Sequence, residues 1–102
     1  MAEAIVSPDG KLQIMRHSIV YPGMGPKSVQ GAVKNLGSAV ATAEIKVEFY
    51  DESGNSLGQC SGVFKDIAPG EVRLFDVWAE RLPNMYEIES YKIASLRTVS
   101  NT

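Results

Sequence analysis

The alternation of apolar and polar residues is clearest over residues 40–54, VATAEIKVEFYDESG. Successive side chains of an extended chain point to opposite sides, so apolar residues at every second position mark a strand with one buried face. A helix would need apolar residues three and four positions apart, and that spacing would place Glu44 and Glu48 on its apolar side. The pattern therefore predicts a half-buried β-strand. Its inward-facing residues are Ala41, Ala43, Ile45, Val47 and Phe49.

Weaker versions of the same alternation recur between turns rich in glycine and proline. These segments carry β-branched and aromatic residues, which are typical of strands. Near Arg16 the alternation breaks, which indicates a bulge. In the segment after residue 71 we expect Phe75 and Val77 to face inward, because the opposite facing would bury Asp76. The further expected strands are residues 11–20, 27–34, 56–65, 72–79 and 91–99.

Residue types also predict the turns. The segment Asp51–Asn55 fits a hairpin connection with Gly54 in the left-handed conformation. Ala68–Glu71, with the sequence APGE, fits a type II turn, because proline presets the first central φ and Gly70 accepts the positive second one. Residues 80–90 are polar, and we expect a long connection there with one helical turn.

Short strands joined by turns, with no periodic helix, predict an all-β antiparallel sandwich of about seven strands. A chain of 102 residues is long enough for one domain with a two-layer core. We place a loose N-terminal tail at residues 1–10, because SPDG at 7–10 has the composition of a turn. The sandwich then occupies residues 11–99, and residues 100–102 form a C-terminal tail.

Composition and charge exclude some classes of binding partner. Hydrophobic residues make up 44% and charged residues 22% of the chain, as in ordinary globular proteins. The net charge is -2 and the basic residues are scattered, so we expect no nucleic-acid binding. No apolar run approaches the roughly 20 residues of a membrane-spanning helix, so we expect no membrane insertion. Cys60 is the only cysteine, which excludes an intramolecular disulfide.

Candidate chemistry centres on His17, the only histidine. A nucleophilic site would have to combine it with Cys60, and the expected topology gives no reason for the two to meet. We therefore expect no catalytic residue and no enzyme activity. Met15, His17 and Met24 are the ligand types that copper prefers, but methionines usually fill gaps in a core. We assign no metal or cofactor residue, and leave metal binding by these three residues as an open question.

Two other binding chemistries are suggested by single residue types. Asp51, Ser53 and Asn55 carry oxygen atoms at alternate positions, as calcium loops do, but the glycine and the bidentate glutamate of an EF-hand loop are missing. We expect a simple turn there. Carbohydrate binding uses exposed aromatic side chains and is retained as an alternative. The candidate aromatic residues are Trp78, Tyr50, Tyr21 and Tyr86.

Three motifs stand in order along the chain: VQGAVKN at 29–35, VEFYD at 47–51 followed by Gly54 and Asn55, and IAPGE at 67–71 followed by Phe75. In this order they are similar to the FxLYD family of small immunoglobulin-like domains of prokaryotic proteins, over about residues 12–99. Phe49 stands where that family has leucine. The resemblance implies an immunoglobulin-like sandwich from secreted, periplasmic or surface-anchored proteins. It brings no catalytic residue with it.

The expected function is therefore a non-enzymatic interaction or spacer module that binds partners through strand edges or end loops. A carbohydrate-binding module is the alternative, and a periplasmic metal-binding domain is less favoured. The segment Ser56–Lys65 carries few charges, so we expect it to be an edge that pairs with another chain, most simply a second copy. Replacing Gly62 by proline should then weaken the pairing, because proline lacks an N–H donor.

Overall fold

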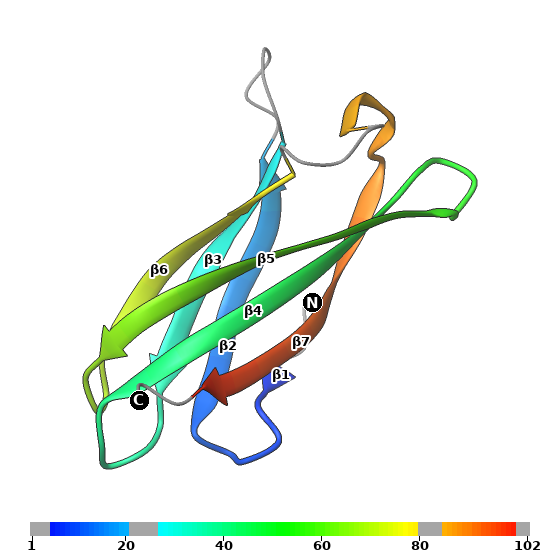
Figure 1. Cartoon of the computed structure of the whole chain (residues 1–102). Coiled ribbons are helices and arrows are strands. Elements are labelled where there is room, and N and C mark those ends of the chain that lie inside the picture. The colour runs from blue at the N-terminus through cyan, green and yellow to red at the C-terminus, as the bar shows by residue number, and fades with distance from the viewer. Residues whose placement is uncertain (1–4, 21–26, 80–84, 100–102) are drawn as a thin grey trace.

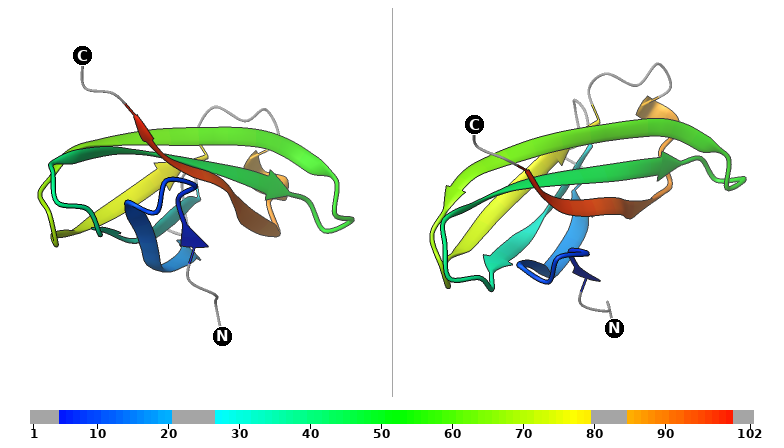
Figure 2. Two further views of the ribbon diagram at one scale, coloured as in Figure 1. Left: turned by 90° about the horizontal axis from the view of Figure 1, so that it is seen from below. Right: turned by 60° about the horizontal axis from the view of Figure 1, so that its bottom comes forward.

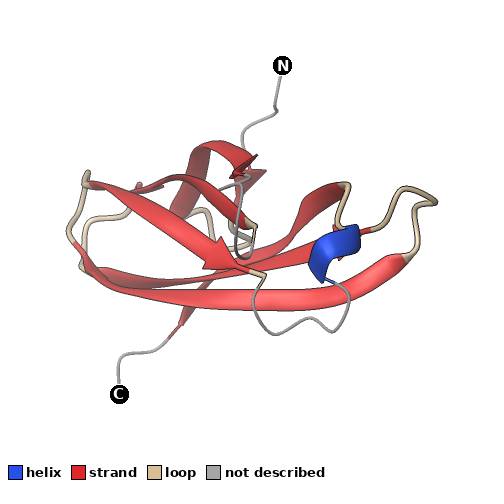
Figure 3. Cartoon of the chain, turned by 90° about the horizontal axis from the view of Figure 1, so that it is seen from above, coloured by secondary structure: helices blue, strands red, loops and turns tan. Residues whose placement is uncertain are grey.

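The computed structural model describes residues 5–20, 27–79 and 85–99, and Figure 1 shows the course of the chain. Strands account for most of these residues. A single turn of 3-10 helix, η1, precedes the last strand, and Figure 3 shows it as the one helical element of the described residues. The elements are β1 (Ile5–Val6), β2 (Leu12–Val20), β3 (Ser28–Asn35), β4 (Ala41–Tyr50), β5 (Ser56–Ile67), β6 (Val72–Trp78), η1 (Met85–Glu87) and β7 (Ser90–Val99).

Two antiparallel sheets pack face to face, which confirms the predicted all-β sandwich. One sheet has the strand order β1-β2-β3-β6 and the other β5-β4-β7. The views of Figure 2 show the two layers, with β4 and β5 extending beyond the other sheet at one end. Strands β2, β3 and β6 correspond to A, B and E of an immunoglobulin-type sandwich, and β5, β4 and β7 to C′, C and F. Within the described residues, no strand follows β7 in the place of G.

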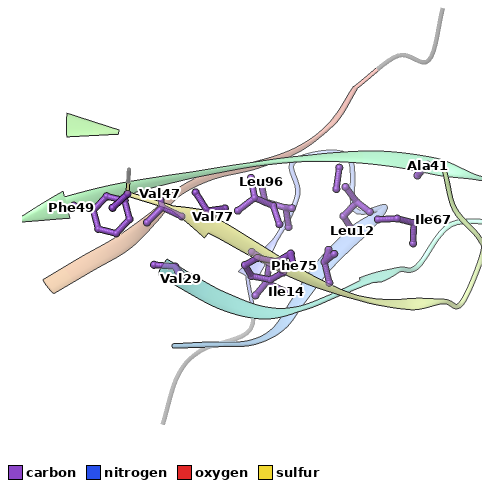
Figure 4. Close-up of a cluster of buried hydrophobic side chains, with 14 of the residues drawn as sticks. Leu12, Ile14, Val29, Ala41, Val47, Phe49, Ile67, Phe75, Val77 and Leu96 are labelled. Atoms are coloured by element: carbon purple, nitrogen blue, oxygen red, sulfur yellow. The ribbon is translucent and has the colours of Figure 1, made fainter. Parts of the chain in front are cut away.

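Strand β4 is the centre of its sheet, and its facing is as predicted. Its odd-numbered residues are buried, with Ile45, Val47 and Phe49 completely so. They pack against β3 and β6 of the other sheet, where Phe75 and Val77 are buried as expected (Figure 4). On the outer side, Lys92 and Arg97 of β7 form ion pairs with Glu48 and Glu44 of β4. Apolar residues at period two therefore build the core, and charged ones cover the outside of this sheet.

The expected start of the domain at residue 11 is too late. Ile5 and Val6 form β1 and pair with Ile14 and Gln13 of β2. A strand of two residues is too short to produce a periodic pattern, so its formation depends on the neighbouring strand. The predicted bulge in β2 is confirmed, because the pairing with β3 shifts between Ile14 and Arg16.

Both predicted turns are confirmed. Gly54 has φ 83°, and its N–H donates to Asp51 C=O at 3.1 Å, which closes the β4–β5 hairpin. Gly70 has φ 79°, and the Glu71 N–H donates to Ala68 C=O at 2.9 Å, as a type II turn requires. The helical turn expected within residues 80–90 is η1. The expected loop at residues 21–26 and the tails at 1–4 and 100–102 lie outside the described residues.

Candidate functional site

The candidate site is the outer edge of β5. Among the described strands it pairs with β4 alone, so it is an edge strand, as the sequence predicts. Between Gly58 and Phe64 the pairing with β4 is regular, from Phe49 opposite Gly58 to Ala43 opposite Phe64. Register shifts flank this stretch at both ends. We call Gly58–Phe64 the edge segment.

The hydrogen bonds fix which backbone groups of the edge segment point away from β4. In an antiparallel ladder, alternate residues direct their N–H and C=O groups to opposite sides. The Asp51 N–H donates to Asn55 C=O at 3.0 Å across the hairpin, so the odd-numbered residues of β4 bond to β5. Ile45 therefore bonds to its partner Gly62. The residues whose N–H and C=O groups point outward are Gln59, Ser61 and Val63.

The side chains of the edge segment are uncharged. Gln59 and Ser61 are exposed on the outer face of the sheet, and 51% of Val63 is exposed. On the inner face, Gly58, Cys60 and Gly62 are small and half-buried, as expected where a sheet ends. Natural edges are usually protected by charges, proline or short length. The edge segment has none of these protections, and it therefore retains the capacity to pair with another strand.

Strand β6 supports β5 from the inner side of the sandwich and leaves its edge accessible. The Phe64 and Phe75 rings pack with their centroids 5.9 Å apart. A Cβ atom on Gly62 would lie 2.8 Å from the Phe64 ring and 3.6 Å from the Asp76 carbonyl oxygen, so the two strands approach closely at this glycine. Arg73 of β6 donates to the C=O groups at the end of β5, at Lys65 and Asp66, at 3.0 and 3.2 Å. The ring contact and the close approach at Gly62 hold β5 from its inner face, and Arg73 binds the backbone at its end.

The other edges are less suited to pairing. Strand β1 has two residues. The edge of β6 approaches β5 at Asp76, where the carbonyl oxygen lies beneath Gly62. Strand β7 is tied to the facing sheet at one end, because the hydroxyl of Tyr91 and Nδ1 of His17 lie 2.7 Å apart. Among the described edge strands, β5 is also the longest, with 12 residues against 10 in β7, 7 in β6 and 2 in β1.

His17 is part of this bridge between the sheets and lies apart from Cys60. Its ring also meets the Tyr91 ring edge-on at 5.6 Å between centroids. Burial lowers the pKa of His17, which favours the neutral imidazole. Met15 occupies the bulge and is half exposed, and Met24 lies outside the described residues. Of the three hypothetical copper ligands, the structure thus describes two, and it places His17 against Tyr91 and Met15 in the exposed bulge.

The hairpin loop uses its carboxylate for the turn itself. Asp51 Oδ1 accepts hydrogen bonds from the N–H groups of Ser53 and Asn55, both at 2.9 Å. These donors lower the pKa of Asp51, the bond from Asn55 first. A depression of about 320 Å³ lies between this loop and Glu87 and Glu89. Because Asp51 Oδ1 already accepts two backbone N–H groups, the loop is explained as the predicted turn.

Aromatic residues and a shallow groove mark the outer face of the other sheet. Trp78 is 42% and Leu74 69% exposed on β6, and the indole N–H of Trp78 donates to the Asp76 carboxylate at 3.1 Å. A depression of about 460 Å³ lies beside Leu74 and crosses β2, β3 and β6, where His17 pairs with Gly31 and Gly31 with Phe75. Its side walls include Arg16, Ser18, Gln30 and Leu74. Tyr86 is exposed on η1, Tyr50 is half-buried beside Lys92, and Tyr21 lies outside the described residues.

Comparisons with known proteins return no match: no family model, no curated protein and no solved structure corresponds to the chain. The resemblance to the FxLYD family therefore stays a prediction. In residues 5–20, 27–79 and 85–99, no helix has the length and apolarity to cross a membrane. The same residues contain no cluster of three or more histidine, cysteine, aspartate or glutamate side chains arranged to bind a metal ion.

Proposed function

We propose that the protein is a non-enzymatic binding module that adds an extended strand of a partner to the edge of β5. The observation that supports this proposal is the coincidence, in the edge segment, of outward backbone groups, regular pairing and uncharged side chains. In strand addition, main-chain hydrogen bonds supply affinity and side-chain contacts supply selectivity. The proposed secreted or cell-surface setting rests on the FxLYD resemblance alone.

The expected affinity is modest. Gln59, Ser61 and Val63 offer three N–H and three C=O groups to a partner. Each net hydrogen bond contributes about 0.5–1.5 kcal/mol. Association costs roughly 4–15 kcal/mol in lost translational and rotational freedom. The edge segment alone therefore supports weak, reversible binding, and higher affinity needs side-chain contacts from the partner.

A peptide of alternating valine and threonine is a suitable probe of strand addition, because main-chain pairing does not require one particular partner sequence. In a titration followed by NMR, the amide signals of Gln59, Ser61 and Val63 should shift. Those of Cys60 and Gly62, which already bond to β4, should shift much less. Absence of shifts in β5, or shifts confined to another strand, would contradict the proposal.

Position 61 offers a matched pair of variants. Ser61→Pro removes an outward N–H at an exposed edge, where proline is tolerated. Ser61→Ala removes only the hydroxyl and keeps the N–H. We expect the proline variant to lose peptide binding and the alanine variant to retain it. Equal binding by both variants would show that the backbone of β5 is not the contact.

Carbohydrate binding is the second candidate, supported by the exposed Trp78 of β6 and by the groove over β2, β3 and β6, which Leu74 of the same strand lines. An indole face packs on a sugar ring, and Arg16 and Gln30 are suitable hydrogen-bond donors. A glycan array with wild-type protein and Trp78→Ala tests this candidate. Binding that disappears in the variant supports it, and an array without signal counts against it.

A further inference from the structure

We propose that the strand added to β5 is the β5 of a second copy, antiparallel and related by a two-fold axis at Ser61. This inference rests on the proposed function and names its partner. The two three-stranded sheets would join into one continuous sheet across the axis. Interfaces with two-fold symmetry require a surface that is complementary to itself, and the edge segment meets that requirement.

Backbone geometry fixes the register. With Ser61 opposite itself, Gln59 of one copy faces Val63 of the other. All three outward-directed residues then have outward-directed partners. A register displaced by two residues leaves either Gln59 or Val63 opposite an irregular end of the strand, where the pairing with β4 shifts. The centred register therefore forms the most hydrogen bonds.

The charges of β5 are compatible with pairing to a second copy. In the centred register the charged residue Lys65 faces Leu57, and Asp66 faces Ser56, so no like charges oppose each other. Like charges directly opposite in a sheet are destabilising. Strand β7, paired with itself over its whole length, would instead set Lys92 opposite Arg97. Self-pairing is thus favoured at β5 and disfavoured at β7.

The inner face of the joined strands is also complementary. Gly58 of one copy faces Phe64 of the other, in a pair without mutual hydrogen bonds, where side chains come closest. The Phe64 ring is half-buried in a single copy, and Gly58 offers no side chain to exclude it. An aromatic ring beside an edge glycine shields its backbone from water. Both glycine-rich strands therefore gain apolar cover on pairing.

Charge-swap variants at the axis test the proposal. Ser61→Lys and Ser61→Glu each place like charges opposite each other, so the self-dissociation constant of each should rise roughly two- to fivefold. A one-to-one mixture places lysine opposite glutamate and should associate at least as tightly as wild type. Leu74→Lys, on the exposed face of β6, is the control and should associate as wild type does. Sedimentation equilibrium up to about millimolar protein measures the wild type, the three variants and the mixture.

Three results would overturn the inference. A wild type that stays monomeric at the highest concentration would exclude a second copy as the partner of β5. The peptide titration tests separately whether β5 adds a strand of any partner. A mixture that associates no better than its components would exclude a two-fold axis at position 61. Loss of association in the Leu74→Lys control, with association of the Ser61 variants unchanged, would move the interface to the opposite sheet.

Discussion

Replacement of Asn35 by alanine should be among the most destabilising changes of a polar residue in this domain. Asn35 ends β3 and is 1% exposed. Its Nδ2 donates to the C=O groups of Ala39 at 2.8 Å and Ile67 at 2.9 Å. Its Oδ1 accepts from the Gly37 N–H at 2.8 Å. One side chain thus joins the loop after β3 to the end of β5.

The expected cost follows from these bonds. Each of the three side-chain hydrogen bonds contributes about 0.5–1.5 kcal/mol, which gives about 3 kcal/mol in total. Carbonyl groups left buried without a donor add to the loss. Domains of this size are stable by roughly 5–15 kcal/mol, so Asn35→Ala should remove a large part of the stability.

Urea unfolding followed by circular dichroism measures this cost, with Asn55→Ala as the control. Asn55 lies in the exposed hairpin loop, and its side-chain contact with Asp51 is long, at 3.4 Å. We expect the control to lose less than about 0.5 kcal/mol. Asn35→Asp keeps an acceptor but sets a carboxylate against two carbonyls, so it should become more stable as pH falls and the carboxylate is protonated. A cost below about 1 kcal/mol for Asn35→Ala would refute the reasoning.

Three further predictions concern the core, a turn and a titrating group. Phe49→Ala should lower the free energy of unfolding in urea by about 3–5 kcal/mol and Tyr50→Ala by clearly less, because only the Phe49 side chain is fully buried. The reverse order would contradict the facing of β4. Gly70→Val should lower the melting temperature, because φ 79° excludes a β-branched residue, and an unchanged temperature would refute the turn geometry. Hydrogen bonds from Ser7 and the Lys11 amide lower the pKa of Asp9 from 3.8 to about 2. The ionised Asp9 carboxylate therefore stabilises the fold fully above pH 3.8, and this contribution is lost as the pH falls toward 2. NMR titration should show a higher Asp9 pKa in Ser7→Ala, and an unchanged value would exclude this cause.

Local patterns in the sequence were sufficient to predict most of the fold. The alternation of β4 determines its buried face because adjacent residues must lie on opposite sides of a sheet. Gly54 and Gly70 mark their turns because positive φ is a property of single residues. The contact of His17 with Tyr91 has no such local signature. These residues are 74 positions apart, and only the packing of the two sheets brings them together.

The candidate site was predicted only in part. Low charge in residues 56–65 identified an edge strand, but the sequence does not show which residues direct their N–H groups outward. That direction depends on the pairing with β4, where Gly62 lies opposite Ile45 and bonds inward. Gly62→Pro would therefore break the ladder within the sheet, and the prediction that it tests the edge is wrong. Ser61 is the position at which proline removes an outward donor.

Amide hydrogen exchange at low and high protein concentration tests the central claim most directly. If the edge of β5 pairs with a second copy, exchange at Gln59, Ser61 and Val63 should slow as the concentration rises. Exchange along the edge of β7 should stay unchanged over the same range. Rates at the three β5 residues that do not depend on concentration, or slowing confined to β7, would contradict the account.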